Sequence, residues 1–303
     1  MRPTMQVCPT RSLTLALFAY HAPTTREEAQ RLLAADPAAR PLAGGTDLIV
    51  QLRSGRIGNA SVVDLKHVAG LTGVRALPGG GFAIGAATPS TGLKNHTALS
   101  AAWPGVVEAA NLIGSVQVRN RATIAGNLCN ASPAADSVPA LIAAGATALI
   151  VGPGGEREVP VEAVPTAPGK TSLAPGEFVA EIRLPARPVG GGDAYLRAIP
   201  RTEMDIAVVG AGVALVIGAD GTCTAARIAL GAVGPTALLV ADASAALVGS
   251  KLDDAALARM TAAVVAAARP ISDKRGTAEY RTHMAGVLTR RAVAIARKRA
   301  ETN

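Results

Sequence analysis

Apolar and polar positions follow two different periods through the first 65 residues. The segment PTTREEAQRLLAAD (23–36) places a threonine three residues before a glutamate and then apolar residues at helical spacing, which is typical of a capped amphipathic helix. ARPLAGGTDLIVQLRSG (39–55) predicts a short strand, a turn at Gly44–Gly45 and an apolar stretch, and SVVDL (61–65) predicts a buried strand. We therefore expect a strand–helix–strand unit at the start of the chain.

The middle of the chain carries two hairpin signals. Glycine clusters at 79–81 and 152–155 each separate two strand-like runs. Residues 97–112 and 137–144 have helical patterns between these hairpins. EFVAEIRLP (177–185) predicts one more strand, which a proline ends.

A linker is predicted at ARPVGGGD (186–193), and the pattern changes after it. DIAVVGAGVALVIGADGTCTAARIALGAV (205–233) predicts two strands joined at Asp220–Gly221, and helical patterns follow at 253–268 and 281–300. We expect an antiparallel sheet with helices on one side. VVGAGVAL resembles a dinucleotide-binding glycine motif, but Leu215 stands where its third glycine belongs and the strand pattern continues, so we expect no Rossmann site there.

Composition changes this picture in a few places. Apolar residues make up 49% of the chain and aromatic residues only 2%, so the core must consist of Val, Ile, Leu and Ala. The three cysteines and four histidines are scattered and form no CxxC pair, which argues against zinc or an iron–sulfur cluster held by this chain and against a disulfide framework. No apolar run predicts a transmembrane helix. Arg11 and the following SLTLALFAY weakly resemble a signal peptide, but no obvious small-residue cleavage site is present, so we expect a cytoplasmic protein.

The net charge of +8 is concentrated late, in RTHMAGVLTRRAVAIARKRA (281–300). The apolar residues on one predicted helical face are Met284, Val287, Leu288 and Ile295. This leaves the arginines and Lys298 on the other faces, where we expect them to meet solvent or an acidic partner subunit. Nucleic-acid binding is not expected, because no basic–aromatic pattern accompanies the charge.

Two glycine-containing segments are the candidates for chemistry. PLAGGTDLI (41–49) predicts a loop whose bare N–H groups can hold a phosphate, although an ordinary strand-turn explains it equally well. TIAGN (123–127) predicts a second such loop, and two of them suit a diphosphate. Asn127 and Asn130 can donate and accept around such a ligand. Asp136 precedes a predicted helix, so it fits an N-cap, which the residues alone favour, or an acceptor for ribose hydroxyls.

Four motifs together resemble one family. AGGTDL and TIAGNLCNASPAADSVPAL, followed by YLRAIPRTEMDIAVVGAGVAL (195–215) and RPISDKRGTAEYRTHMAGVLTRRAV (269–293), are similar to the flavin-binding subunits of molybdenum hydroxylases. That family includes the medium subunit of aerobic carbon monoxide dehydrogenase and the flavin domain of xanthine dehydrogenase. The resemblance implies an α+β chain. A vanillyl-alcohol-oxidase (PCMH)-type FAD-binding domain would span 1–187, in subdomains of about 1–65 and 66–187, and a C-terminal domain of antiparallel sheet with helices would span 193–303.

The resemblance also implies the FAD-binding residues. The first pyrophosphate loop would be formed by Ala43, Gly44, Gly45, Thr46, Asp47 and Leu48. The second would be formed by Thr123, Ile124, Ala125, Gly126 and Asn127, with Asn130 close by. Ala125 departs from the two glycines usual in the family. Asp136 would lie near the adenosine ribose, Val179 would line the flavin pocket, and Arg197 stands where many relatives carry a lysine near the isoalloxazine ring. No catalytic residue and no metal ligand is implied.

The implied function is electron transfer inside a larger oxidoreductase. A large subunit would carry the molybdenum cofactor, a small subunit would carry two 2Fe–2S clusters, and FAD in this chain would pass electrons to an external acceptor. A dimer of heterotrimers is expected. Two alternatives remain open, a stand-alone FAD oxidase and a non-enzymatic nucleotide-binding protein.

Overall fold

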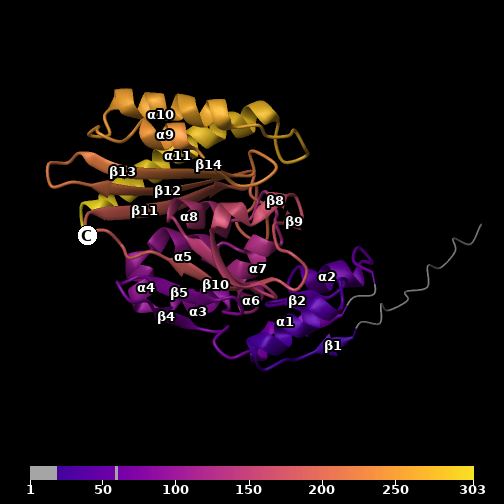
Figure 1. Ribbon diagram of the computed structural model, residues 1–303. Helices are drawn as coiled ribbons and strands as arrows, with labels where there is room; N and C mark the ends of the chain where they lie inside the picture. Colours follow the sequence, from indigo (N-terminus) through magenta and orange to yellow (C-terminus); the bar gives the residue numbers. More distant parts are fainter. Residues whose placement is uncertain (1–18, 59–60) are drawn as a thin grey trace, which may run out of the picture.

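The computed structural model describes residues 19–58 and 61–303 (Figure 1). The leader-like stretch that begins at Arg11 lies almost entirely outside these residues, as does Cys8. No helix within the described ranges has both the length and the apolar character needed to cross a membrane. The fold consists of three successive layers, each with a sheet and helices.

The N-terminal layer, residues 19–68, is a parallel sheet with two helices. Its strands lie in the order β1–β3–β2. The bounds are β1 Tyr20–His21, α1 Arg26–Ala35, β2 Arg40–Leu42, α2 Leu48–Arg53, β3 Val62–Asp64 and a 3-10 turn at Leu65–His67. The capping box is confirmed, since the Thr25 hydroxyl accepts from the Glu28 N–H and the Glu28 carboxylate accepts from the Thr24 N–H, both at 3.2 Å. The predicted strand–helix–strand unit is therefore present.

The middle layer, residues 74–184, is an antiparallel sheet in the order β4–β5–β10–β6–β7. Its strands are β4 Val74–Ala76, β5 Phe82–Gly85, β6 Thr147–Gly152, β7 Gly155–Pro160 and β10 Phe178–Leu184, with the small pair β8 Pro165–Ala167 and β9 Lys170–Thr171 beside a 3-10 turn at Val161–Ala163. Its helices are α3 Ser90–Lys94, α4 Thr97–Ala102, α5 Pro104–Asn111, α6 Val116–Arg119, α7 Ile124–Cys129 and α8 Ser137–Ala143. Both predicted hairpins, β4–β5 and β6–β7, are confirmed.

The sheet of the middle layer is covered on both faces, so its central strands are almost fully buried. Ile150 and Ile182 face the core formed with the helices of the same layer, including Leu141 of α8. Val151 and Phe178 face the opposite side and pack against the N-terminal layer. The two layers therefore share a continuous apolar contact across this sheet.

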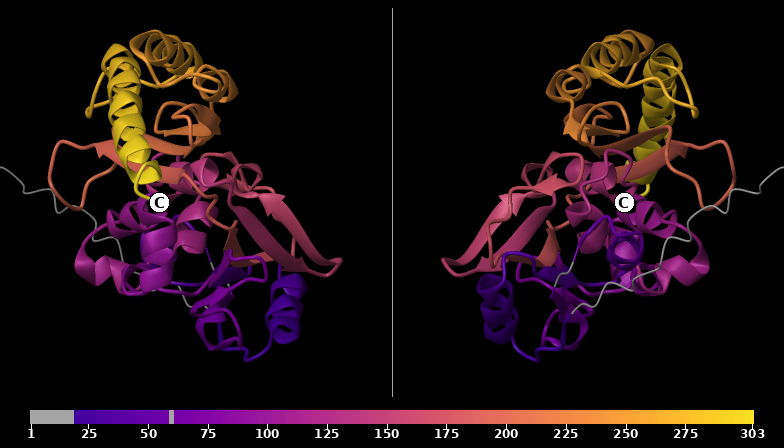
Figure 2. Two further views of the ribbon diagram at one scale, coloured as in Figure 1. Left: turned by 90° about the vertical axis from the view of Figure 1, so that its left-hand side faces the viewer. Right: turned by 90° about the vertical axis from the view of Figure 1, so that its right-hand side faces the viewer.

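The C-terminal layer is an antiparallel sheet with its own helices on one face. Its elements are β11 Gly191–Ala198, β12 Val209–Ile217, β13 Cys223–Gly231, β14 Leu238–Leu239, α9 Ala241–Ala245, α10 Asp254–Ala267 and α11 Ala278–Ala300. Helices α9, α10 and α11 lie on one face, while α5 and α8 of the middle layer approach the other (Figures 1 and 2). The predicted sheet with helices on one side is confirmed. Strand β12 runs straight through Gly210 and Gly212, so no Rossmann turn forms there.

The basic helix α11 differs from expectation in its buried face and at Arg281. Of the predicted apolar face, Leu288 is buried, whereas Met284, Val287 and Ile295 are half-buried. Its first arginine, Arg281, is 4% exposed and does not lie on a solvated face. Its guanidinium pairs with Asp273 at 2.7 Å and donates to the carbonyl of Val208 at 2.9 Å. The buried residues of α11 include four alanines and a glycine, small residues that let the helix pack closely on the sheet.

Candidate functional site

A cleft of about 500 Å³ lies between the N-terminal and middle layers. It is lined mainly by residues 39–48, 122–130 and 169–179. The predicted site residues among its lining are Ala43, Gly44, Gly45, Thr46, Asp47, Leu48, Thr123, Ala125, Gly126, Asn127, Asn130 and Val179. Ile124, Asp136 and Arg197 are not part of this lining, and Ile124 packs into the core of the middle layer. The structure thus brings most of the predicted residues together at one cleft.

The first glycine-containing segment touches the backbone just before the second segment. A Cβ atom on Gly44 would stand 2.0 Å from the carbonyl oxygen of Arg121, so only glycine permits this approach. Gly45 has a φ of 79°, which turns the chain from β2 toward α2. Gly44 therefore joins the two walls of the cleft, and Gly45 makes the turn within the first wall.

The prediction of a second glycine loop at 123–127 is wrong in its local structure. Thr123 is extended and caps α7, with its hydroxyl accepting from the Gly126 N–H at 2.9 Å. A single glycine costs a helix only about 1 kcal/mol, so a good cap outweighs it. A Cβ atom on Gly126 would stand 3.0 Å from the Thr123 hydroxyl, tighter than an ordinary contact, and would meet no other atom within 4 Å apart from the backbone of its own helix. The bare surface that the sequence indicated is therefore the first turn of a helix.

The two asparagines connect parts of the cleft. Asn127 Oδ1 accepts from the Ser137 hydroxyl at 2.7 Å, which ties α7 to the start of α8. Asn130 Oδ1 accepts from Gln51 Nε2 at 3.1 Å, which ties α7 to α2 across the cleft. Gln51 lines the cleft and was missed from the sequence, because a polar residue on a short helix gives no signal of its own.

A third wall, residues 169–179, was also missed apart from Val179. This wall includes β9 and ends at the start of β10. Glu177 in this wall pairs with Arg157 at 2.7 Å. The turn residues Pro175 and Gly176 were the available signal. Arg40 is the basic side chain of the described lining, and its Nη1 already donates to the carbonyls of Pro37 and Ala39. Backbone N–H groups are therefore the main donors available to an anion in the cleft.

Asp136 and Arg197 form a buried group with Tyr195. Asp136 Oδ2 lies 2.6 Å from Arg197 Nη1, and its Oδ1 accepts from the Tyr195 hydroxyl at 2.8 Å. Burial raises the pKa of Asp136, although Arg197 and Tyr195 oppose that shift. Burial also raises the pKa of Tyr195 well above its ordinary value, and the neighbouring Asp136 adds to the shift.

This geometry changes how both residues are interpreted. Asp136 stands at the N-cap position of α8, but its carboxylate accepts no helix N–H, so the capping interpretation is wrong. Because Asp136 and Arg197 are in direct contact, they reach the same point. An extended FAD keeps its adenosine ribose far from its isoalloxazine ring. Asp136 beside the ribose and Arg197 beside the isoalloxazine ring are therefore competing roles, and both stay predictions.

Comparison with known proteins places the chain in a family. Residues 16–187 match the FAD binding domain in molybdopterin dehydrogenase, and residues 194–296 match the CO dehydrogenase flavoprotein C-terminal domain. The chain therefore belongs to the family of FAD-binding subunits of molybdopterin dehydrogenases, and it is an oxidoreductase subunit. The expected family and fold are confirmed.

The individual relatives agree with this assignment. The carbon monoxide dehydrogenase medium chain of Afipia carboxidovorans is 38% identical over 94% of this chain and 98% of its own length. The xanthine dehydrogenase FAD-binding subunit of Escherichia coli O157:H7 is 31% identical over 91% of this chain and 95% of its own. A solved structure of reconstituted CO dehydrogenase from Oligotropha carboxidovorans superposes with a TM-score of 0.89 at 37% identity, covering 93% of this chain and 98% of that one.

Proposed function

We propose that this chain is the FAD-carrying electron-transfer subunit of a molybdenum hydroxylase complex. The observation that carries the proposal is the cleft, where two glycine-containing segments far apart in the sequence meet and present backbone in place of large side chains. Family membership identifies FAD as the cofactor. When bound, FAD accepts electrons from one partner and passes them to another.

The residues of the cleft fit the dinucleotide. Gly44 and Gly45 let one wall pack closely, and Gly126 at the other wall leaves room for a pyrophosphate beside backbone N–H groups. Asn130 and Gln51 hold these walls together through their side-chain hydrogen bond, which fixes the spacing that the cofactor would meet. The apolar side chains of Leu48 and Val179 supply surface for the flat parts of the ligand.

We propose the partners by analogy with the relatives. A large subunit would hold the molybdenum cofactor and a small subunit would hold 2Fe–2S clusters, most simply in a dimer of heterotrimers. Electrons would reach the FAD from the clusters and leave for an external acceptor. We place the domain boundary between 187 and 193. The described cysteines, Cys129 and Cys223, are free thiols, which supports a reducing, cytoplasmic compartment.

Acid precipitation of the purified protein tests the bound cofactor. We expect all the flavin to appear in the supernatant as FAD by mass spectrometry, because the cleft offers shape and hydrogen bonds for non-covalent binding. The same assay on heat-denatured protein is the control for incomplete release. A yellow pellet, or release of FMN alone, would contradict the proposal.

A further inference from the structure

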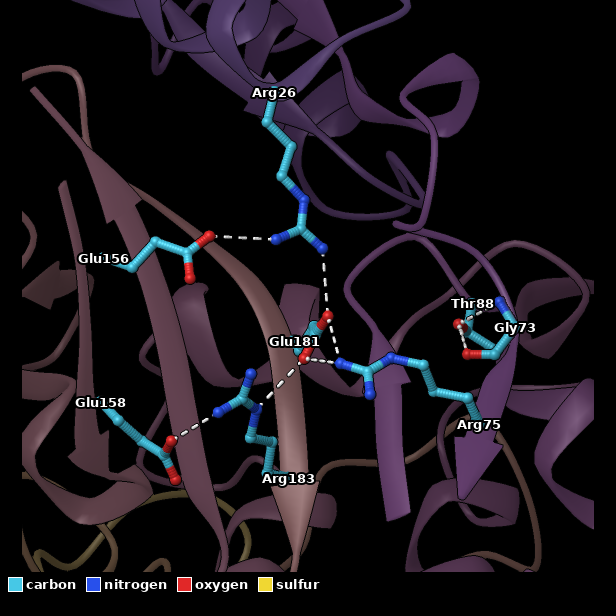
Figure 3. Close-up of polar contacts among 8 residues, drawn as sticks. All are labelled: Arg26, Gly73, Arg75, Thr88, Glu156, Glu158, Glu181 and Arg183. Atoms are coloured by element: carbon cyan, nitrogen blue, oxygen red, sulfur yellow. Dashed lines mark hydrogen bonds and ion pairs between the residues drawn. The ribbon is translucent and has the colours of Figure 1, made fainter. Parts of the chain in front are cut away.

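Glu181 on β10 is a buried carboxylate held by three arginines (Figure 3). It is 2% exposed and lies 3.0 Å from Arg26 Nη2, 2.8 Å from Arg75 Nη2 and 3.1 Å from Arg183 Nε. Burial alone would raise the pKa of Glu181, but the three guanidinium groups outweigh it and hold the pKa below its ordinary value. Arg26 also pairs with Glu156 on β7 at 3.2 Å.

A β-bulge gives Glu181 this position. The pairing of β10 with β6 shifts by one residue between Val179 and Glu181. Phe178 and Ala180 face the N-terminal layer, so simple alternation would turn Glu181 into the apolar core on the opposite face. The extra residue returns the carboxylate to the face where the arginines lie. The bulge thus places the Glu181 carboxylate beside its three arginine partners.

Helix α1 and strand β10 both run between this cluster and the cleft. At one end, Arg26 of α1 meets Glu181 of β10. At the other end, Leu33 of α1 and Phe178 of β10 line the cleft. Apolar packing joins the two elements between these points, with Ala29 and Ala180 in the same core cluster. Figure 2 shows α1, in indigo, beside the tip of the β6–β7 hairpin.

The chain between the two layers is fixed near the same cluster. Residues 69–73 connect the N-terminal layer to β4, which carries Arg75. The Thr88 hydroxyl accepts from the Gly73 N–H at 2.9 Å and donates to the Gly73 carbonyl at 3.0 Å (Figure 3). These hydrogen bonds hold the connecting segment on the sheet. Helix α1 makes its own ionic contact with the middle layer through Arg26, at the end of the helix near Glu181.

We propose that the ion pairs of Arg26 with Glu181 and Glu156 form a clamp that fixes the N-terminal layer on the sheet and thereby sets the spacing of the cleft walls. Arg26 is then a positioning residue for the cofactor, although it does not line the cleft. This inference rests on the proposed binding of FAD. Loss of the clamp lets α1 tilt about its apolar contacts and loosens the wall near Leu33.

The test compares Arg26→Met with Arg31→Met, which removes an exposed arginine from the same helix. We expect Arg26→Met to release FAD about tenfold faster, the usual scale of coupling between separate sites, while Arg31→Met behaves as wild type. Amide hydrogen exchange in residues 26–35 should also become faster in Arg26→Met. Arg26→Lys should restore part of both effects, because one ammonium can reach Glu181 but cannot bridge two carboxylates as a guanidinium does.

The outcomes separate the two claims. If Arg26→Met releases FAD at the same rate as Arg31→Met, the clamp is overturned, whatever the rate of hydrogen exchange. Faster release with no rescue by lysine overturns the assignment to the ion pairs. Wild-type protein that holds no FAD at all is a failure of the proposed function, and it is recognised before any variant is measured.

Discussion

Gly44 and Gly126 look alike in the sequence but serve the cleft differently. Gly44 lies against the backbone of Arg121, so any side chain there would push the two walls apart. Gly126 faces open space beyond the Thr123 hydroxyl, so a side chain there would enter the cleft. A substitution at Gly126 therefore tests contact with the ligand, whereas one at Gly44 tests the assembly of the walls.

We predict that Gly126→Val weakens FAD binding by about tenfold or more, because forcing extra methyl groups into a packed contact costs about 1–3 kcal/mol. The melting temperature of the FAD-free protein should change little. Gly154→Val, in the open turn of the β6–β7 hairpin, is the matched control. Titration of FAD-free protein with FAD gives the dissociation constants, and equal values for the two variants would show that Gly126 does not approach the cofactor.

Local signals in the sequence identified the glycines, but not the contacts that their polar neighbours make. Gly45 and Gly126 were predictable because bare backbone before an apolar pattern is a local feature. The contacts of Asn130 with Gln51, and of Asp136 with Arg197, join residues 79 and 61 positions apart. No local pattern encodes such pairs, so the sequence could indicate these residue types but not what they touch.

At the scale of elements, hydrophobic periodicity predicted the hairpins and the strand at 177–185 well, and the helices well apart from 97–112, which forms two helices, α4 and α5, because Pro104 starts a new one. It failed where a short element depends on one cap or one irregularity. Helix α7 begins because Thr123 caps it, and the bulge in β10 turns Glu181 to the other face. In α11, the periodicity gave the helix correctly but assigned Arg281 to solvent, because the carbonyl that receives it belongs to Val208, 73 residues earlier in the chain.

We predict that Arg281→Met lowers the free energy of unfolding by about 1–3 kcal/mol, because it leaves the buried carbonyl of Val208 without its donor and removes the ion pair with Asp273. Arg291→Met, an exposed position on the same helix, should change it by less than about 0.5 kcal/mol. Urea unfolding followed by circular dichroism measures both. If Arg281→Met were as stable as Arg291→Met, the buried arginine would not anchor α11 to the sheet.

At the scale of the whole molecule, the order of the layers followed from the sequence, but the cleft between them did not. Its third wall comes from residues 169–179, where the pattern predicted only the start of a strand at 177. The described part of the chain also contains no group of His, Cys, Asp and Glu that could hold a metal ion. Under the proposed function, the electrons for the FAD would come from clusters that a partner subunit holds.

The central claim is that the FAD of this chain is reduced through partner subunits. We predict that the chain expressed alone keeps its FAD and that no substrate of molybdenum hydroxylases bleaches the flavin absorbance. Expressed together with its molybdenum and iron–sulfur partners, it should co-elute with them, and addition of the substrate of the complex should bleach the flavin. The most direct measurement is stopped-flow absorbance of the isolated chain mixed with those substrates. Unchanged flavin absorbance is the predicted result, and rapid bleaching without any partner would contradict the account in favour of a stand-alone oxidase.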